Sequence, residues 1–135
     1  MEPAMEYALS TKVNAPFGET VERVRTALAT QGFGVVSEID IAGTLKKKID
    51  VDVPPQLILG ACNPRHAYRA MQAEPSISVL LPCNVVVREV DDGTLVEMIN
   101  PQTMVEVTNN AEMRAVADEV SAMLGAALSE LEQAA

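Results

Sequence analysis

The chain holds two cysteines and one histidine, and all three lie within one short stretch. Cys62 and Cys83 are each followed by asparagine, and His66 lies four residues after the first cysteine. The pair Asn63-Pro64 predicts the start of a helix, with asparagine as the N-cap and proline at the first helical position. A thiol near the N-terminal end of a helix is favoured as the thiolate, which is its nucleophilic form. Cys62 is therefore the first candidate for chemistry.

Cationic side chains follow on the same predicted helix. Arg65 and Arg69 are spaced i, i+4, and His66 and Arg69 are spaced i, i+3, so each pair shares a helix face. Amides at a helix N-terminus also bind anions. We interpret the region as a candidate pocket for a small ligand with an anionic or thiol-reactive group. Its candidate binding residues are Cys62, Asn63, Arg65, His66, Arg69 and Cys83. The alternative is structural: buried cysteines, a capping asparagine and solvated cations.

A metal site is a second interpretation of the same residues. Cys62, His66 and Cys83 offer soft or borderline ligands that suit zinc or copper. The sequence supplies no clear fourth ligand and no Cys-x-x-Cys pair, so we predict no metal and no cofactor. It also lacks a glycine-rich phosphate loop, a Gly-x-Ser-x-Gly elbow and a His-Glu-x-x-His motif. Whether the protein is an enzyme therefore stays open.

Length and charge narrow the class of protein. With 135 residues, the chain is expected to be a single domain, with a core over about residues 7–131. Its net charge of −9 repels nucleic acids and anionic membranes. It has no apolar run of membrane-spanning length and no secretory signal at its N-terminus. Two cysteines without an export signal predict free thiols in the cytoplasm.

Hydrophobic periodicity predicts both strands and helices. Strands are expected over residues 5–13, 34–41, 57–61, 77–90 and 94–99, and helices over 19–31, 44–49, 64–73 and about 22 residues after an N-cap at Asn109. This order, β-α-β-(α)-β-α-β-β-α, predicts an α+β fold with a mostly antiparallel or mixed sheet and helices packed mainly on one face. Gly32 is expected to end the first long helix in the left-handed conformation. The last helix carries an apolar stripe of Met113, Val116, Ala117, Val120, Leu124, Ala127, Leu128 and Leu131.

Three segments together resemble a known family. Residues 32–40 (GFGVVSEID), 58–64 (ILGACNP) and 80–87 (LLPCNVVV) occur in the order found in the domain of unknown function family 302. The resemblance covers roughly residues 7–131. It implies a small bacterial or archaeal α+β domain that is often a homodimer, and it implies no known reaction.

Three functions remain open at this stage. The first is a dimeric cytoplasmic domain that binds a small anionic or thiol-reactive ligand around Cys62, Asn63 and His66. The second is a cysteine-dependent enzyme for thiol or sulfur transfer, with Cys62 as the nucleophile. The third is a structural or interaction module whose cysteines are inert. Exposure of Cys62 distinguishes them, because a nucleophile must be accessible.

Overall fold

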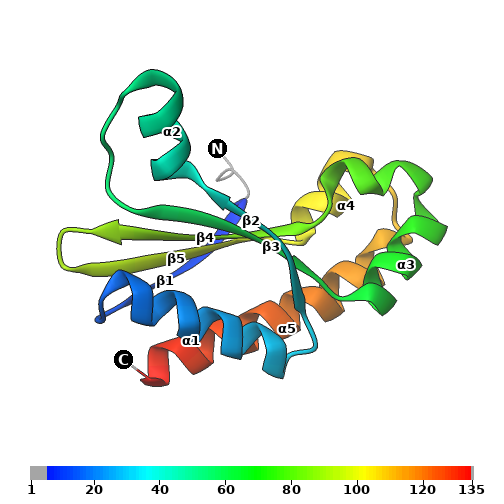
Figure 1. Cartoon of the computed structure of the whole chain (residues 1–135). Coiled ribbons are helices and arrows are strands. Elements are labelled where there is room, and N and C mark those ends of the chain that lie inside the picture. Colours follow the sequence, from blue (N-terminus) through cyan, green and yellow to red (C-terminus); the bar gives the residue numbers. More distant parts are fainter. Residues whose placement is uncertain (1–5, 135) are drawn as a thin grey trace, which may run out of the picture.

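The structure is a computed structural model that describes residues 6–134 (Figure 1). Its strands are β1 (Ala8–Val13), β2 (Gly34–Asp40), β3 (Gln56–Cys62), β4 (Cys83–Val90) and β5 (Gly93–Ile99). Its helices are α1 (Phe17–Thr30), α2 (Ile41–Ile49), α3 (Pro64–Ala73), α4 (Gln102–Thr108) and α5 (Met113–Ala134), with a 3₁₀ helix η1 (Pro75–Leu80). The predicted α+β class is therefore confirmed.

The five strands form one open sheet in the order β1-β5-β4-β3-β2, and every neighbouring pair is antiparallel. The long helices α1 and α5 cover one face of this sheet (Figure 1). Helix α2 lies on the opposite side near β2 and β3, and α3, η1 and α4 gather at one end. None of the described helices is long and apolar enough to cross a membrane.

The core lies between the sheet and its two long helices. Val85 and Val87 of β4 and Val96 and Met98 of β5 are buried, whereas the residues between them are partly or fully exposed. This alternation is expected of a sheet with one covered face. Every residue of the stripe predicted on α5 is buried. The stripe therefore closes the core along the length of α5.

Gly32 ends α1 as predicted. Its φ of 84° is left-handed, which glycine adopts without steric cost. The amide of Phe33 donates to the carbonyl oxygen of Leu28 at 3.0 Å, and the amide of Gly32 donates to that of Ala29 at 3.0 Å. These two bonds form a Schellman motif, which satisfies carbonyls that the helix end would leave free.

The strand predicted over residues 77–90 is wrong in its first part. Residues 75–80 form η1 instead, and β4 begins only at Cys83. Ile77 is buried but Val79 is 84% exposed, so their alternation does not mark one strand face. Pro75 suits the first position of a helical turn, and Pro82 has no amide hydrogen to donate to a sheet. The two prolines thus confine the strand to the residues that follow them.

Predictions for the ends of three other elements also need correction or fall outside the described residues. Asn109 is not the N-cap of the last helix. Its φ of 50° is left-handed and ends α4, a helix that was not expected from the sequence. The side chain of Asn110 instead accepts a hydrogen bond from the amide of Glu112 at 2.9 Å. Ile41 begins α2 rather than ending β2. Met5, predicted at the start of the first strand, lies outside the described residues.

Candidate functional site

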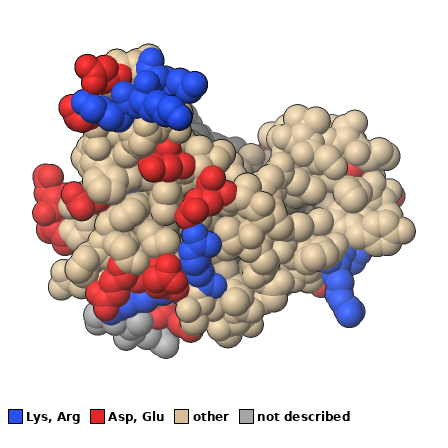
Figure 2. Space-filling model, viewed as in Figure 1, with Lys and Arg blue, Asp and Glu red and all other residues tan. Residues whose placement is uncertain are grey.

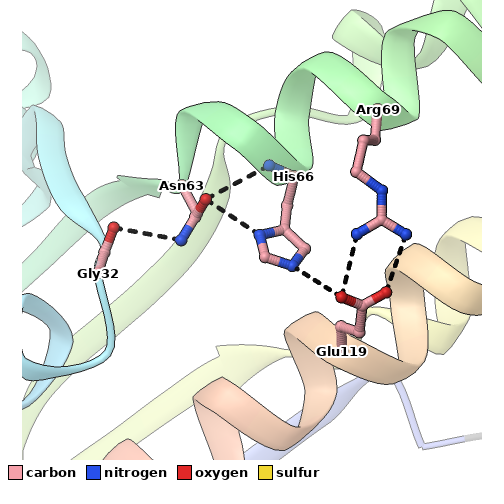
Figure 3. A network of polar contacts seen from close by, with 5 residues as sticks. All are labelled: Gly32, Asn63, His66, Arg69 and Glu119. Carbon is pink, nitrogen blue, oxygen red and sulfur yellow. Dashed lines mark hydrogen bonds and ion pairs between the residues drawn. The ribbon is translucent and has the colours of Figure 1, made fainter.

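Asn63 connects the end of β3 to the start of α3. Its Oδ1 accepts a hydrogen bond from the amide of His66 at 3.3 Å, which confirms the predicted N-cap (Figure 3). Its Nδ2 donates to the carbonyl oxygen of Gly32 at 3.3 Å. An amide donor on one side and a carbonyl acceptor on the other fix which way the Asn63 side chain points. The residue therefore caps α3 and also ties it to the turn after α1.

The ring of His66 lies between two oxygen acceptors. Nδ1 is 3.0 Å from Oδ1 of Asn63, and Nε2 is 3.4 Å from Oε1 of Glu119 on α5 (Figure 3). Because Oδ1 of Asn63 is an acceptor, Nδ1 must carry a hydrogen to bond with it. Nε2 faces the carboxylate of Glu119. The ring therefore links α3 to α5.

Arg69 forms a two-pronged ion pair with the same carboxylate. Its two terminal nitrogens donate to Oε1 and Oε2 of Glu119 at 3.0 and 2.9 Å (Figure 3). This is the bidentate geometry that guanidinium and carboxylate favour. Its hydrogen bond with Glu119 raises the pKa of Arg69, and the same bond lowers the pKa of the Glu119 carboxyl group. Arg69 is therefore occupied by an acid of its own chain.

A small cavity lies beside this network. Its volume is about 30 Å³, and Cys62, Asn63, His66 and Cys83 all contribute to its wall. The other lining residues are apolar: Phe33, Ala61, Ala67, Ala70, Leu81, Pro82, Met104, Val116 and Val120. Arg65 and Arg69 do not line it. The structure thus brings four of the predicted site residues to one cavity and leaves the two arginines outside it.

The two thiols at this cavity differ in environment. Both are free; Cys62 is partly exposed, and Cys83 is buried opposite Ala61 in the β3–β4 ladder. Burial, and secondarily the neighbouring Cys62, raises the pKa of the Cys83 thiol to about 11. A thiol with that pKa stays protonated at neutral pH and is a poor nucleophile. Of the two, only Cys62 is placed to react with a molecule that enters from solvent.

The structure does not bring the candidate metal ligands Cys62, His66 and Cys83 together around one point. Within residues 6–134, no three His, Cys, Asp or Glu side chains are grouped so that they could hold a metal ion. The ring nitrogens of His66 face Asn63 and Glu119 instead. The set Cys62, His66 and Cys83 is therefore not a metal centre in this structure.

Sequence reasoning missed Glu119, which joins His66 and Arg69. It is 50 residues from Arg69 along the chain, and nothing near the Cys-Asn motif points to it. The one available signal was its place on the last helix, next to the apolar stripe at Val116 and Val120. A polar residue that flanks a buried stripe faces whichever element packs alongside.

Fold and site together define a small α+β domain with a five-stranded antiparallel sheet and a thiol-lined cavity at one end. The chain belongs to the family "Domain of unknown function DUF302", whose model matches residues 9–131. It is similar to the crystal structure of an uncharacterized conserved DUF302 protein from Bacillus stearothermophilus, with 27% sequence identity and a TM-score of 0.87. That match covers 93% of this chain and 98% of the other. Comparison with curated proteins gives no match.

Proposed function

We propose that this protein binds a small ligand at the cavity beside Cys62, Asn63 and His66. The observation that carries the proposal is the contrast between two thiols on one cavity wall: Cys62 is partly exposed and Cys83 is buried. A pocket with mostly apolar walls and a few polar groups is the usual form of a small-molecule site. Cys62 supplies the reactive group of this pocket.

The cavity limits the size of what can enter. A cavity of about 30 Å³ holds roughly two water-sized groups, because one water needs about 10 to 15 Å³ of such space. Only a small end group (head) of a ligand fits inside the cavity, so the rest of the ligand must lie across the cavity opening. A thiol-reactive head would meet Cys62 there. An anionic ligand would rely on Arg65, because Arg69 is paired with Glu119.

The experiment compares two alkylating probes of similar size, neutral iodoacetamide and anionic iodoacetate. We expect both to label Cys62 in the native protein, read by peptide mass spectrometry. If Arg65 attracts anions, the rate ratio of iodoacetate to iodoacetamide is higher in the native than in the urea-unfolded chain, and Arg65→Ala lowers it. Lys47→Ala is the matched control, because it removes one positive charge from a distant helix. Absence of native labelling at Cys62 would contradict the proposed site.

A cysteine-dependent reaction is less well supported. It requires an accessible Cys62, and the partial exposure of Cys62 meets that condition. A general base beside the thiol is one way to activate it. Both ring nitrogens of His66 already face other oxygens, so His66 is not aimed at Cys62 as a base. We therefore propose binding rather than catalysis.

We also propose that the protein acts in the cytoplasm as a homodimer. Free cysteines support a reducing compartment. Support for a dimer comes from large apolar side chains that the single chain leaves in contact with solvent, among them Val36, Ile49 and Val79. Exposed apolar patches mark interaction surfaces when they are contiguous. Light scattering on the purified chain tests the homodimer, and a monomer at all concentrations would contradict it.

A further inference from the structure

Both thiols of the chain lie at the same small cavity. Cys62 and Cys83 contribute to its wall, and the chain has no other cysteine. In the β3–β4 ladder, Cys83 lies opposite Ala61, the residue before Cys62. Cα atoms of ladder partners are about 4.5 to 5.5 Å apart, and the next residue lies about 3.4 Å further along the strand. The Cα atoms of Cys62 and Cys83 are therefore about 6 Å apart, which is within the range of about 4.4 to 6.8 Å that a disulfide spans.

The alternation of β3 does not separate the two side chains. In a regular strand, Cys62 would point to the face opposite Ala61 and Cys83. Here β3 ends at Cys62 and α3 begins at Pro64, and both cysteines line one cavity. Burial is the main cause of the raised pKa of the Cys83 thiol, and the neighbouring Cys62 is the second. The two sulfur atoms are thus near enough to interact and to meet one small molecule.

Size and charge limit which molecule can meet both thiols inside the cavity. It holds roughly two water-sized groups. Neither Arg65 nor Arg69 lines it, and Arg69 is paired with Glu119. Figure 2 shows few charged side chains on the visible face of the end that holds α3, η1 and α4. A neutral molecule of two heavy atoms therefore fits this cavity better than an anion does.

We infer that the ligand of this cavity is a small neutral peroxide, with hydrogen peroxide as the simplest member, and that it converts Cys62 and Cys83 into a reversible disulfide. Hydrogen peroxide has two heavy atoms, carries no charge at neutral pH and oxidises thiols. The reaction is a stoichiometric modification of the protein. The inference rests on the proposed ligand site and names the chemistry of its ligand.

The oxidation has two steps. The thiolate of Cys62 first attacks one peroxide oxygen: an S–O bond forms, the O–O bond breaks, and the hydroxide that leaves takes up the proton that Cys62 released. The sulfur of Cys83 then attacks the sulfenic acid of Cys62. An S–S bond forms, the S–O bond breaks, and the hydroxyl leaves with the proton of Cys83 as a second water. The thiols lose two electrons, which the peroxide gains, and a dithiol reductant reverses the change.

Burial assigns the order in which the two thiols react. Cys62 is partly exposed, so a peroxide reaches it from solvent. Cys83 is buried, and its pKa of about 11 keeps it protonated at neutral pH, so it is not the first nucleophile. The second step is therefore the slower one at neutral pH, and it should become faster as the pH rises toward that pKa.

The test treats the native protein with hydrogen peroxide and follows both cysteines by peptide mass spectrometry. We expect a Cys62–Cys83 disulfide within one chain, which dithiothreitol reduces. Cys83→Ala should stop at the sulfenic acid of Cys62, which dimedone traps, and Cys62→Ala should leave Cys83 as a thiol. Circular dichroism confirms that both variants are folded, and the wild type alone shows whether the disulfide forms.

A bulky peroxide tests whether the cavity selects its ligand by size. Cumene hydroperoxide reacts at the same O–O bond, but its aromatic group exceeds the cavity. Each rate of Cys62 oxidation is divided by the rate in the urea-unfolded chain, which cancels the intrinsic reactivity of the peroxide. This ratio should be several-fold higher for hydrogen peroxide. Equal ratios would contradict a peroxide site of this size.

The outcomes distinguish this inference from the proposed ligand site. If iodoacetamide labels native Cys62 but hydrogen peroxide yields no disulfide with Cys83, the ligand site stands and the inference is wrong. Absence of native labelling at Cys62 would contradict both. Met104 also lines the cavity. Its oxidation to the sulfoxide in place of the two cysteines would contradict the inference, because the peroxide would then enter without reacting at the thiols.

Discussion

Helices α5 and α2 both carry an apolar stripe, but the two stripes differ in how far they are buried. The stripe of α5 is buried along its whole length, from Met113 to Leu131. No residue of α2 is buried. A helix of 22 residues is about 33 Å long and crosses the sheet, whereas α2 has nine residues and contacts mainly β3. Periodicity therefore identifies a face that needs covering, but not what covers it.

The difference in burial between α5 and α2 also predicts where substitutions affect folding. The α5 side holds the core and the cavity with Cys83, so changes there should act on folding. No residue of α2 is buried, so changes there should have little effect on folding. The predictions below test this division, in order of decreasing effect.

The largest effect is expected from Leu124→Ala. Leu124 is fully buried on α5, and truncation leaves a cavity that should cost about 3 kcal/mol of unfolding free energy. Ile49→Ala on α2 should change the unfolding free energy of the monomer by less than about 0.5 kcal/mol. Urea unfolding at low protein concentration measures both. Similar losses for the two variants would show that α2 contributes to the stability of the monomer as much as α5 does.

The buried thiol should make stability depend on alkaline pH. The pKa of Cys83 is about 11 in the folded chain and 9.0 without its surroundings. The unfolded chain therefore loses this proton first, so stability is intact below pH 9 and falls until about pH 11. The loss is on the order of 2 to 3 kcal/mol. Urea unfolding of wild type and Cys83→Ala across this range isolates it, because the variant lacks the thiol. Cys62→Ala should keep most of the loss, since burial is the main cause.

Two N-caps allow a direct comparison of the two sides. Asn63→Ala removes the cap of α3 and the bond to Gly32, and should cost about 1 kcal/mol. Asp40→Ala removes the cap of α2, which can unravel without exposing the core, so it should cost less than about 0.5 kcal/mol of global stability. Urea unfolding of the two variants checks the order. A larger loss for Asp40→Ala would show that α2 contributes to the core fold.

The smallest effect is expected from Glu119→Gln, because the ion pair with Arg69 is exposed to solvent. The pKa of Glu119 is lowered in the folded chain, so the pair stabilises above the ordinary carboxyl pKa and its contribution is lost as pH falls through the folded value. Hydrogen exchange of α3 amides should therefore speed up in the variant at neutral pH and converge with wild type in acid. Unchanged exchange would show that the Arg69–Glu119 ion pair does not stabilise the packing of α3 on α5.

Local signals in the sequence predicted local structure well. Gly32 ends α1, Asn63 caps α3, and the stripe of α5 is buried, because each depends on neighbouring residues alone. The hydrophobicity of the η1 residues alternates as it would in a strand. Pro75 at the start of η1 and Pro82 just after it nevertheless confine β4 to the residues that follow. Helix α4 was missed because its valines and threonines favour strands.

The candidate site was predictable only where it depends on residues that are neighbours in the sequence or in one strand ladder. Cys62, Asn63 and His66 lie within five residues of sequence, and Cys83 joins them through the β3–β4 ladder. Glu119 comes from α5 and depends on how two helices pack, which no local pattern encodes. Its pairing with Arg69 changes the chemistry of the site, since it removes a cation that the sequence had offered to a ligand.

Native-state alkylation of Cys62 tests whether the cavity is a ligand site. Iodoacetamide is applied to wild type and to Ala67→Leu, which adds bulk to the cavity wall at a half-buried position. We expect that Cys62 is labelled while Cys83 stays protected until the chain unfolds, and that Ala67→Leu slows the labelling of Cys62 without unfolding the protein. Equal labelling of the two thiols, or labelling of Cys62 at the same rate in the variant, would contradict a ligand site at this cavity.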